Sequence, residues 1–166
     1  IEKDEVKIGD LELQSYQADV PALCADAGQP DTLIFAGLTS KYCRGVMALT
    51  NDDNTNLAVA IAARLLAPAL PALCRAEHAD TVANMASFGT RHIINPFEKF
   101  AEYMALALHS PAAYNLLLWL TGLPGTTVAR HREPPKGKWV LCGYGAFGKV
   151  MTRALENAGL PVTIID

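Results

Sequence analysis

Three glycines and a terminal acid near the end of the chain are the residues whose types and spacing suggest chemistry. Residues 139–166 read WVLCGYGAFGKVMTRALENAGLPVTIID, so Gly143, Gly145 and Gly148 form the pattern G-x-G-x-x-G after a short apolar run. In such a loop the first glycine permits a tight turn, and the second lets a diphosphate approach the main chain. The third lets the following helix pack closely on the strand. The helix then points its free N–H groups at the anion.

Asp166 completes this pattern. It follows a second apolar run, about 20 residues after the glycines, where an acid accepts hydrogen bonds from a ribose. A carboxylate at that position favours a free 2′-hydroxyl, and therefore NAD over NADP. The expected cofactor is NAD(H), with ATP or ADP as the alternative. The predicted contacts are the loop residues and the acid: Gly143, Tyr144, Gly145, Ala146, Phe147, Gly148 and Asp166.

The preceding residues alternate short apolar runs with helical segments. This alternation predicts an α/β fold, a Rossmann-like doubly wound parallel sheet with flanking helices. The predicted strands are 20–24, 45–49, 72–74 and 92–94, and the predicted helices are 31–36, 57–66, 78–88 and 96–109, with 7–16 a short helix or a turn. A very apolar helical segment, 111–120, precedes a linker-like stretch.

The order of these segments predicts parts of two tandem domains. Residues 1–109 form the later part of a first domain with its crossover helix, 110–138 a connector, and 139–166 the opening strand–helix–strand of a second. Glu2 then stands where a first copy places its own ribose acid. Because a parallel sheet without its central strand exposes an apolar edge, we expect residues 139–166 to complete the first sheet. This would happen within the chain, as a circular permutant, or across a dimer.

Composition narrows the class of protein. The chain has 166 residues, 51% hydrophobic and 19% charged, with a net charge of −3, which is typical of a globular protein. The scattered basic residues form no stripe for a nucleic-acid backbone. No signal-peptide pattern opens the sequence, and charges and prolines interrupt the longest apolar stretches, so we expect a cytoplasmic protein.

No metal site is expected. The four cysteines, Cys24, Cys43, Cys74 and Cys142, lack metal-ligand spacing and suggest free, reduced thiols of the core. Asp52 and Asp53 lack the glycine and glutamate of an EF-hand, and we expect them to cap the helix after the loop.

Several runs together resemble the regulator of potassium conductance (RCK) domain, also called the TrkA N-terminal domain. They are Asp26-Ala27, Leu33-x-x-Ala36-Gly37, Val46–Asp53, Asn56-Leu57, Arg75-Ala76, Gly89-Thr90 and Asn95–Glu98. In this family the domain gates potassium channels or senses ligands in Trk-type transporters. The resemblance implies that Asp26, Thr50 and Asp52 lie beside the adenosine and that Arg75 faces the phosphates.

The resemblance also implies the partners. The crossover helix exchanges between subunits in the family, so we expect a dimer through the apolar face of that helix, formed by Phe97, Phe100, Tyr103, Met104 and Leu108. The expected function is a nucleotide-sensing regulatory module at the inner face of the membrane. It would act on a potassium channel pore or a transporter membrane subunit and catalyse no reaction. A fragment of an NAD-dependent dehydrogenase and a Rossmann-like domain without ligand are the alternatives.

Overall fold

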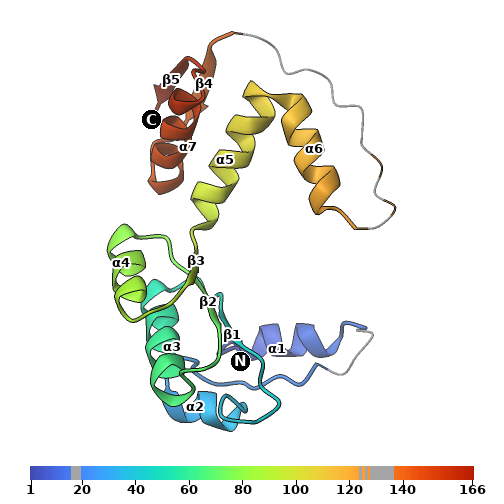
Figure 1. Ribbon diagram of the computed structural model, residues 1–166, viewed down its shortest axis with the longest axis vertical. Coiled ribbons are helices and arrows are strands. Elements are labelled where there is room, and N and C mark those ends of the chain that lie inside the picture. Colours follow the sequence, from blue (N-terminus) through green and yellow to red (C-terminus); the bar gives the residue numbers. More distant parts are fainter. Residues whose placement is uncertain (16–19, 124, 126, 128–136) are drawn as a thin grey trace. The chain divides into compact units, whose positions relative to one another are not determined.

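The computed structural model describes residues 1–15, 20–123, 125, 127 and 137–166. These form two compact units, residues 1–94 and 95–166 (Figure 1). The first holds α1 (Glu5–Glu12), α2 (Pro30–Phe35), β1 (Val46–Ala48), α3 (Asp53–Leu66), β2 (Ala72–Arg75), α4 (Ala79–Ser87) and β3 (His92–Ile94). The second holds α5 (Pro96–His109), α6 (Pro111–Thr121), β4 (Trp139–Cys142), α7 (Ala146–Asn157) and β5 (Val162–Ile165). Residues 124, 126 and 128–136 of the predicted connector lie outside the described residues.

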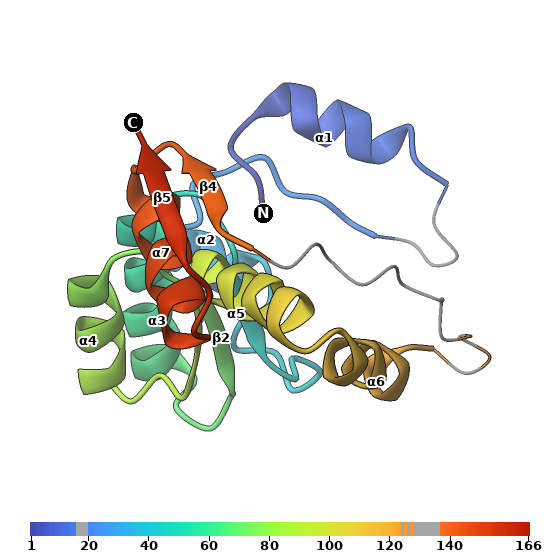
Figure 2. The ribbon, with the colours of Figure 1, turned by 90° about the horizontal axis from the view of Figure 1, so that it is seen from above.

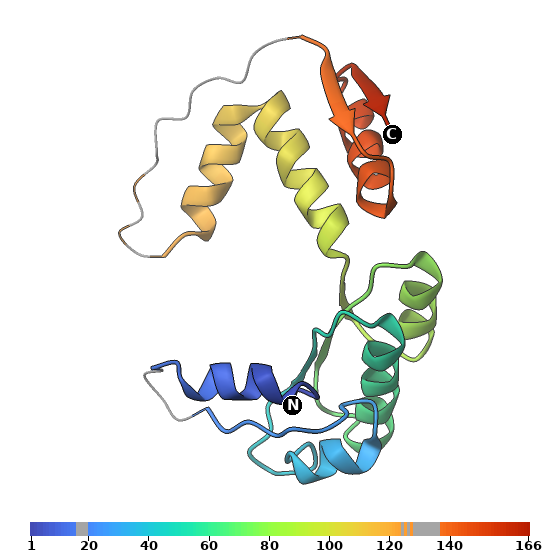
Figure 3. The same cartoon turned by 180° about the vertical axis from the view of Figure 1, so that it is seen from behind.

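The first unit is built on a parallel sheet with strand order β1-β2-β3. Val46 pairs with Ala72 and Leu73 with His92, so neighbouring strands run in register. Helices α3 and α4 pack on these strands and lie side by side (Figure 2), and Figure 3 shows α1 on the opposite side of the strands from α3. The predicted parallel α/β fold is confirmed.

Small side chains let α3 pack close to the sheet. Ala60, Ala62 and Ala63 of α3 are buried, and they pack with Cys74 of β2 and the fully buried Met85 of α4. Close packing of this kind removes apolar surface from water, which is the main force that stabilises such a unit. The buried core residues of the unit are Leu33, Leu38, Ala48, Val59, Ala60, Ala62, Ala63, Cys74, Ala76 and Met85.

Side-chain caps fix where the helices begin. The Asp52 carboxylate accepts hydrogen bonds from the N–H groups of Asn54 and Thr55, so α3 begins at Asp53 rather than at the predicted residue 57. The predicted capping role of Asp52 is therefore confirmed. The same role predicted for Asp53 is wrong, because Asp53 is the first residue of α3 and its carboxylate accepts hydrogen bonds from the N–H groups of Glu77 and His78 instead. Asn95 caps α5 in the same way, and Pro96 occupies its first turn, where the missing N–H costs nothing.

The predicted strand 20–24 is reduced to one parallel bridge between Glu2 and Cys24. The Glu2 N–H donates to Leu23 O at 3.0 Å, and the Ala25 N–H donates to Glu2 O at 3.1 Å. Pro21 has no N–H to add to a ladder, which shortens the pairing.

The second unit has its own parallel pair, β4 and β5, with Cys142 opposite Ile165. Helix α7 packs on this pair, and α5 packs on α7 around the buried residues Ala101, Ala105, Met151 and Leu155. Strands β4 and β5 form a two-stranded sheet of their own. The expectation that residues 139–166 complete the first sheet stays a prediction, as do the predicted domain limits.

The cysteines are free, as expected, but only Cys74 is buried, and that burial raises the pKa of its thiol. Core positions predicted for Cys24 and Cys142 are wrong, since both side chains are exposed. In β4 the residues alternate between a half-buried face toward α7 and an exposed face, and Cys142 lies on the exposed face. No helix in the described part of the chain is long and apolar enough to span a membrane.

Candidate functional site

The glycine loop of the second unit has the geometry that its sequence pattern requires. Gly143 has a φ of 97°, a left-handed conformation that other residues rarely adopt. A Cβ added to Gly148 would come within 3.0 Å of the Gly143 carbonyl oxygen, closer than real Cβ atoms approach other atoms. These glycines are therefore needed by the protein itself, for the turn and for the contact of α7 with β4.

Gly145 differs, because the protein leaves room for a side chain there. Its φ is −67°, and an added Cβ would meet no atom within 4 Å. Gly145 is also the N-cap of α7 and provides no side-chain cap, so the first N–H groups of the helix are left for another acceptor. Glycine at this position suits the approach of a ligand rather than the packing of the chain.

Asp166 lies directly beside this loop. Its carboxylate accepts a hydrogen bond from the Tyr144 N–H at 3.0 Å, and the Gly143 N–H donates to Ile165 O at 2.7 Å. The predicted loop and the predicted acid are thus brought together at the carboxyl ends of β4 and β5, the edge at which doubly wound sheets bind ligands.

Phe147 joins the glycine loop to α5. Its ring lies 5.6 Å from that of Phe97 and 5.4 Å from that of Phe100, centroid to centroid, in tilted arrangements that aromatic rings favour. Phe97 and Leu108, two residues of the expected dimer face, pack toward α7 within the chain. Phe100, Tyr103 and Met104 keep exposed fractions of 50, 48 and 36%.

The first unit gathers its own predicted site residues around one cavity of about 430 Å³. Its lining includes five residues that the sequence singled out: Glu2, Asp26, Thr50, Asp52 and Arg75. Two lysines near the N-terminus, Lys3 and Lys7, also line it. The Glu2 carboxylate accepts hydrogen bonds from the N–H groups of Lys3 and Asp4 at 2.9 and 3.1 Å. The Asp26 carboxylate holds a turn through the Gly28 N–H at 2.9 Å.

A hydrogen bond and an ion pair orient Arg75 within this cavity. Its guanidinium donates to Thr50 O at 3.2 Å and pairs with Glu77. The Glu77 carboxylate offsets part of the positive charge of Arg75 that would attract a phosphate. The sequence alone did not indicate this ion pair.

Sequence reasoning placed Asn56 in the family pattern but gave no role to its side chain, which is fully buried and organises the cavity wall. Its Oδ1 accepts hydrogen bonds from the N–H and hydroxyl of Thr50, at 3.0 and 2.9 Å. Its Nδ2 donates to Thr50 O at 2.9 Å and to Arg75 O at 3.1 Å. One amide therefore holds the loop after β1 against the end of β2.

Asp53 and His78 form a second contact that the sequence did not indicate. Burial raises the pKa of Asp53, but hydrogen bonds from the N–H of His78, its ring and the N–H of Glu77 outweigh burial and lower it. The hydrogen bond from Nδ1 of His78 to Asp53 Oδ2, 2.9 Å long, raises the pKa of the imidazole. This ion pair fastens the start of α3 to the loop between β2 and α4.

Within the described residues no three or more His, Cys, Asp or Glu side chains are grouped to hold a metal ion.

Parallel sheets and a glycine loop at a strand-to-helix turn define a Rossmann-like α/β protein. A family model narrows the class of protein: residues 1–96 match the TrkA-N domain. The chain belongs to the TrkA-N domain family, as its residues predicted.

Two solved structures share the fold. The chain matches "Crystal structure of the GsuK bound to ADP" with a TM-score of 0.65 and 13% identity, over 99% of this chain and 35% of that one. It matches "GsuK Channel" with a TM-score of 0.60 and 13% identity, over 90% of this chain and 32% of that one. The chain therefore spans about a third of their length. No curated protein matches it.

We predict that Asn56→Ala destabilises the first unit by about 2–4 kcal/mol, because the Thr50 N–H and the Arg75 carbonyl would lose the partner that the Asn56 amide gives them. The measurement is a urea titration followed by the NMR methyl signal of Met85, which is buried in the same unit. Asn54→Ala, an exposed asparagine of the same helix, is the control and should change stability by less than about 0.5 kcal/mol. Equal stability of the two variants would contradict the role given to Asn56.

The Asp53–His78 pair predicts a pH dependence. A raised histidine pKa adds stability that is complete below the unfolded pKa and disappears as the pH rises through the folded value. The lowered pKa of Asp53 adds stability that is lost as the pH falls through that value. Asp53→Asn should lower the pKa of His78, followed by NMR of its ring. Asp80→Asn removes only Coulomb attraction and should lower it less. The opposite order would refute the assignment.

Proposed function

We propose that this chain is a nucleotide-sensing regulatory module that binds an adenine nucleotide and catalyses no reaction. The observation that carries the proposal is Gly145, a glycine that packing does not require, at the uncapped start of α7 beside the Asp166 carboxylate. A diphosphate would accept hydrogen bonds from the first N–H groups of α7, where the helix dipole also favours an anion. The Asp166 carboxylate would accept hydrogen bonds from a ribose.

A second nucleotide position is proposed in the first unit. Glu2, Asp26 and Asp52 bring carboxylates to the cavity, and carboxylates suit ribose hydroxyls. Thr50 and Arg75 complete this set, and Asn56 holds both in place. Acids at both ribose positions favour NAD(H), and the ADP named for one GsuK structure supports ADP or ATP as the alternative.

The membrane partner is proposed from the family. Membership in the TrkA-N family and the fold shared with a protein described as "GsuK Channel" support a potassium channel pore or a transporter membrane subunit. The module would then lie in the cytoplasm at the inner face of the membrane. A nucleotide regulates such a partner only if it binds two arrangements of the module with different affinity. The contacts of the Phe147 ring with Phe97 and Phe100 would couple movements of the glycine loop to α5.

Gly145→Ala should weaken binding of ADP and NADH by at least about tenfold, which corresponds to about 1.4 kcal/mol. The added methyl group has space in the protein but stands where the diphosphate must approach. Calorimetry on the whole chain measures the effect. Gly9→Ala, a helix glycine that also has space for a Cβ, is the control and should leave affinity unchanged.

Two results would contradict this function. Unchanged nucleotide affinity in Gly145→Ala would reject the loop as the binding site. Turnover of NADH with any 2-hydroxy or 2-oxo acid would favour the dehydrogenase alternative. In the full-length protein, nucleotide should change potassium flux across vesicles, and the same substitution should remove that response.

Dimerisation through α5 is also proposed, and Tyr103 provides the cleaner test because the Phe100 ring contacts Phe147. Tyr103→Asp should shift the sedimentation coefficient toward that of a monomer, since a charge in an apolar interface lacks a partner. Tyr42→Asp, which changes a tyrosine that is 76% exposed in the first unit, should leave the profile as it is. Identical profiles for both variants would remove α5 as the interface.

A further inference from the structure

A second cavity of the first unit, of about 280 Å³, lies at the opposite end of the sheet from the proposed nucleotide edge. Ala72, the first residue of β2, lines this cavity, whereas Arg75, the last residue of the same strand, lines the cavity beside Thr50. At about 3.3 Å per residue the two positions are about 10 Å apart. The cavity is therefore distinct from the nucleotide site.

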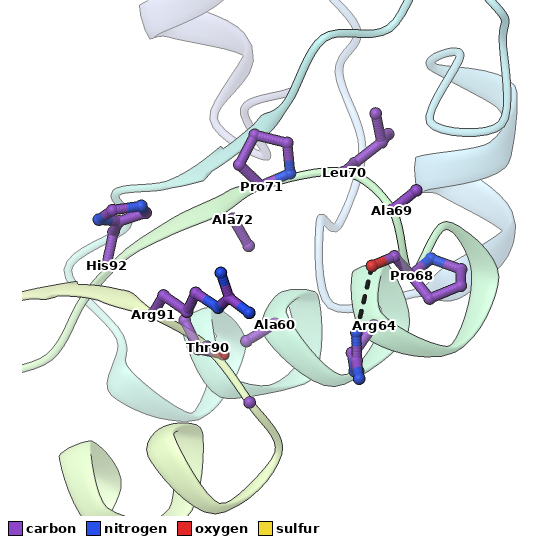
Figure 4. A pocket seen from close by; sticks show the side chains of 11 residues that line it. Ala60, Arg64, Pro68, Ala69, Leu70, Pro71, Ala72, Thr90, Arg91 and His92 are labelled. Carbon is purple, nitrogen blue, oxygen red and sulfur yellow. Dashed lines mark hydrogen bonds between the residues drawn. The ribbon is translucent and has the colours of Figure 1, made fainter.

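The cavity is basic. Arg64, Arg91 and His92 line it, and no aspartate or glutamate does. Figure 4 shows Arg64 on α3, beside Pro68, and Arg91 on the chain that leads into β3. Neither arginine forms a salt bridge among the described residues. Two guanidinium groups that line one cavity without a carboxylate favour the binding of an anion there.

The exposed Arg64 side chain makes one hydrogen bond to the wall of the cavity. Its Nη1 donates to Pro68 O at 3.1 Å, a contact drawn in Figure 4. Gly89 lies against the same guanidinium, and a Cβ there would stand 3.7 Å from Nε. A guanidinium has five N–H donors, so this single bond leaves donors for a ligand.

Small side chains create the space. Ala60, Ala69 and Ala72 line the cavity together with Pro71 and Leu70. They give an apolar wall beside the basic residues, and Thr90 adds a hydroxyl group. Such a lining suits a ligand with a charged group at one end and carbon at the other.

We propose that this cavity binds a small phosphate monoester, with Arg64 and Arg91 holding the phosphate and the alanines facing the carbon part. Guanidinium groups match phosphate oxygens with paired hydrogen bonds, and two of them balance the charge of a dianion. This site does not depend on the nucleotide site of the glycine loop.

The test uses the whole chain, with inorganic phosphate and glycerol 3-phosphate as probes at constant ionic strength. Both should bind saturably, and NMR shifts should centre on the N–H groups of Thr90 and Arg91. Arg91→Gln should weaken binding about tenfold or more, the usual loss for a charge-assisted hydrogen bond. Arg44→Gln, an exposed arginine of the same unit that lies outside this cavity, should leave binding unchanged.

A second variant guards against effects on folding. Ala69→Leu fills the cavity from an exposed position, keeps both arginines and should also weaken binding. Gly145→Ala should leave phosphate affinity as it is, which separates this site from the glycine loop. Absence of saturable binding would overturn the proposal, as would equal loss in Arg91→Gln and Arg44→Gln, or NMR shifts confined to residues 143–148.

Discussion

The first unit depends on the amide of Asn56, a polar group enclosed on all sides by the fold. Its hydrogen bonds to Thr50 and to Arg75 O join the ends of two neighbouring strands. Main-chain groups at the carboxyl end of a parallel sheet have no ladder partners beyond the last pair, and they are costly to bury alone. One side chain that satisfies several of them fixes the loop that carries Asp52 and the strand end that carries Arg75. Asn56 therefore fixes, from inside the core, the wall of the cavity that Asp52 and Arg75 line.

In the second unit no side chain shapes the corresponding edge of the sheet. The contact of Gly148 with the Gly143 carbonyl brings α7 against β4 so closely that no Cβ fits between them. The main-chain N–H groups at the start of α7 then point beyond the end of the strand. In one unit the edge of the sheet is shaped by an amide, and in the other by the absence of side chains. Both arrangements leave a carboxylate beside main-chain groups, Asp52 in the first and Asp166 in the second.

Much of this could be predicted from sequence, because local signals determine it. The G-x-G-x-x-G pattern located the turn before α7, and Pro96 and the polar residue before it placed α5 from 96 to 109. The role of the Asn56 side chain was missed because this residue stands in a run of polar residues that resembles a loop. The signal was present, since Asn56, Val59, Ala60 and Ala63 recur at helical spacing and are all buried. The contact between Asp53 and His78 joins residues far apart in sequence, and Arg64 and Arg91, which line one cavity, are also far apart, so no local pattern reveals either arrangement. The exposure of Cys142 depends on which face of β4 the helix covers, which a short apolar run does not specify.

The position of Phe147 has a consequence for how such a chain can diverge. Its N–H belongs to the turn that faces the strand ends, while its ring is held by Phe97 and Phe100. Replacement of Phe147 by a small residue leaves both partner rings beside a void. A change in either partner alters the packing that supports the turn. These positions should therefore be inherited as a set and covary among relatives, although some 50 residues of chain separate Phe147 from its partners (147 against 97 and 100).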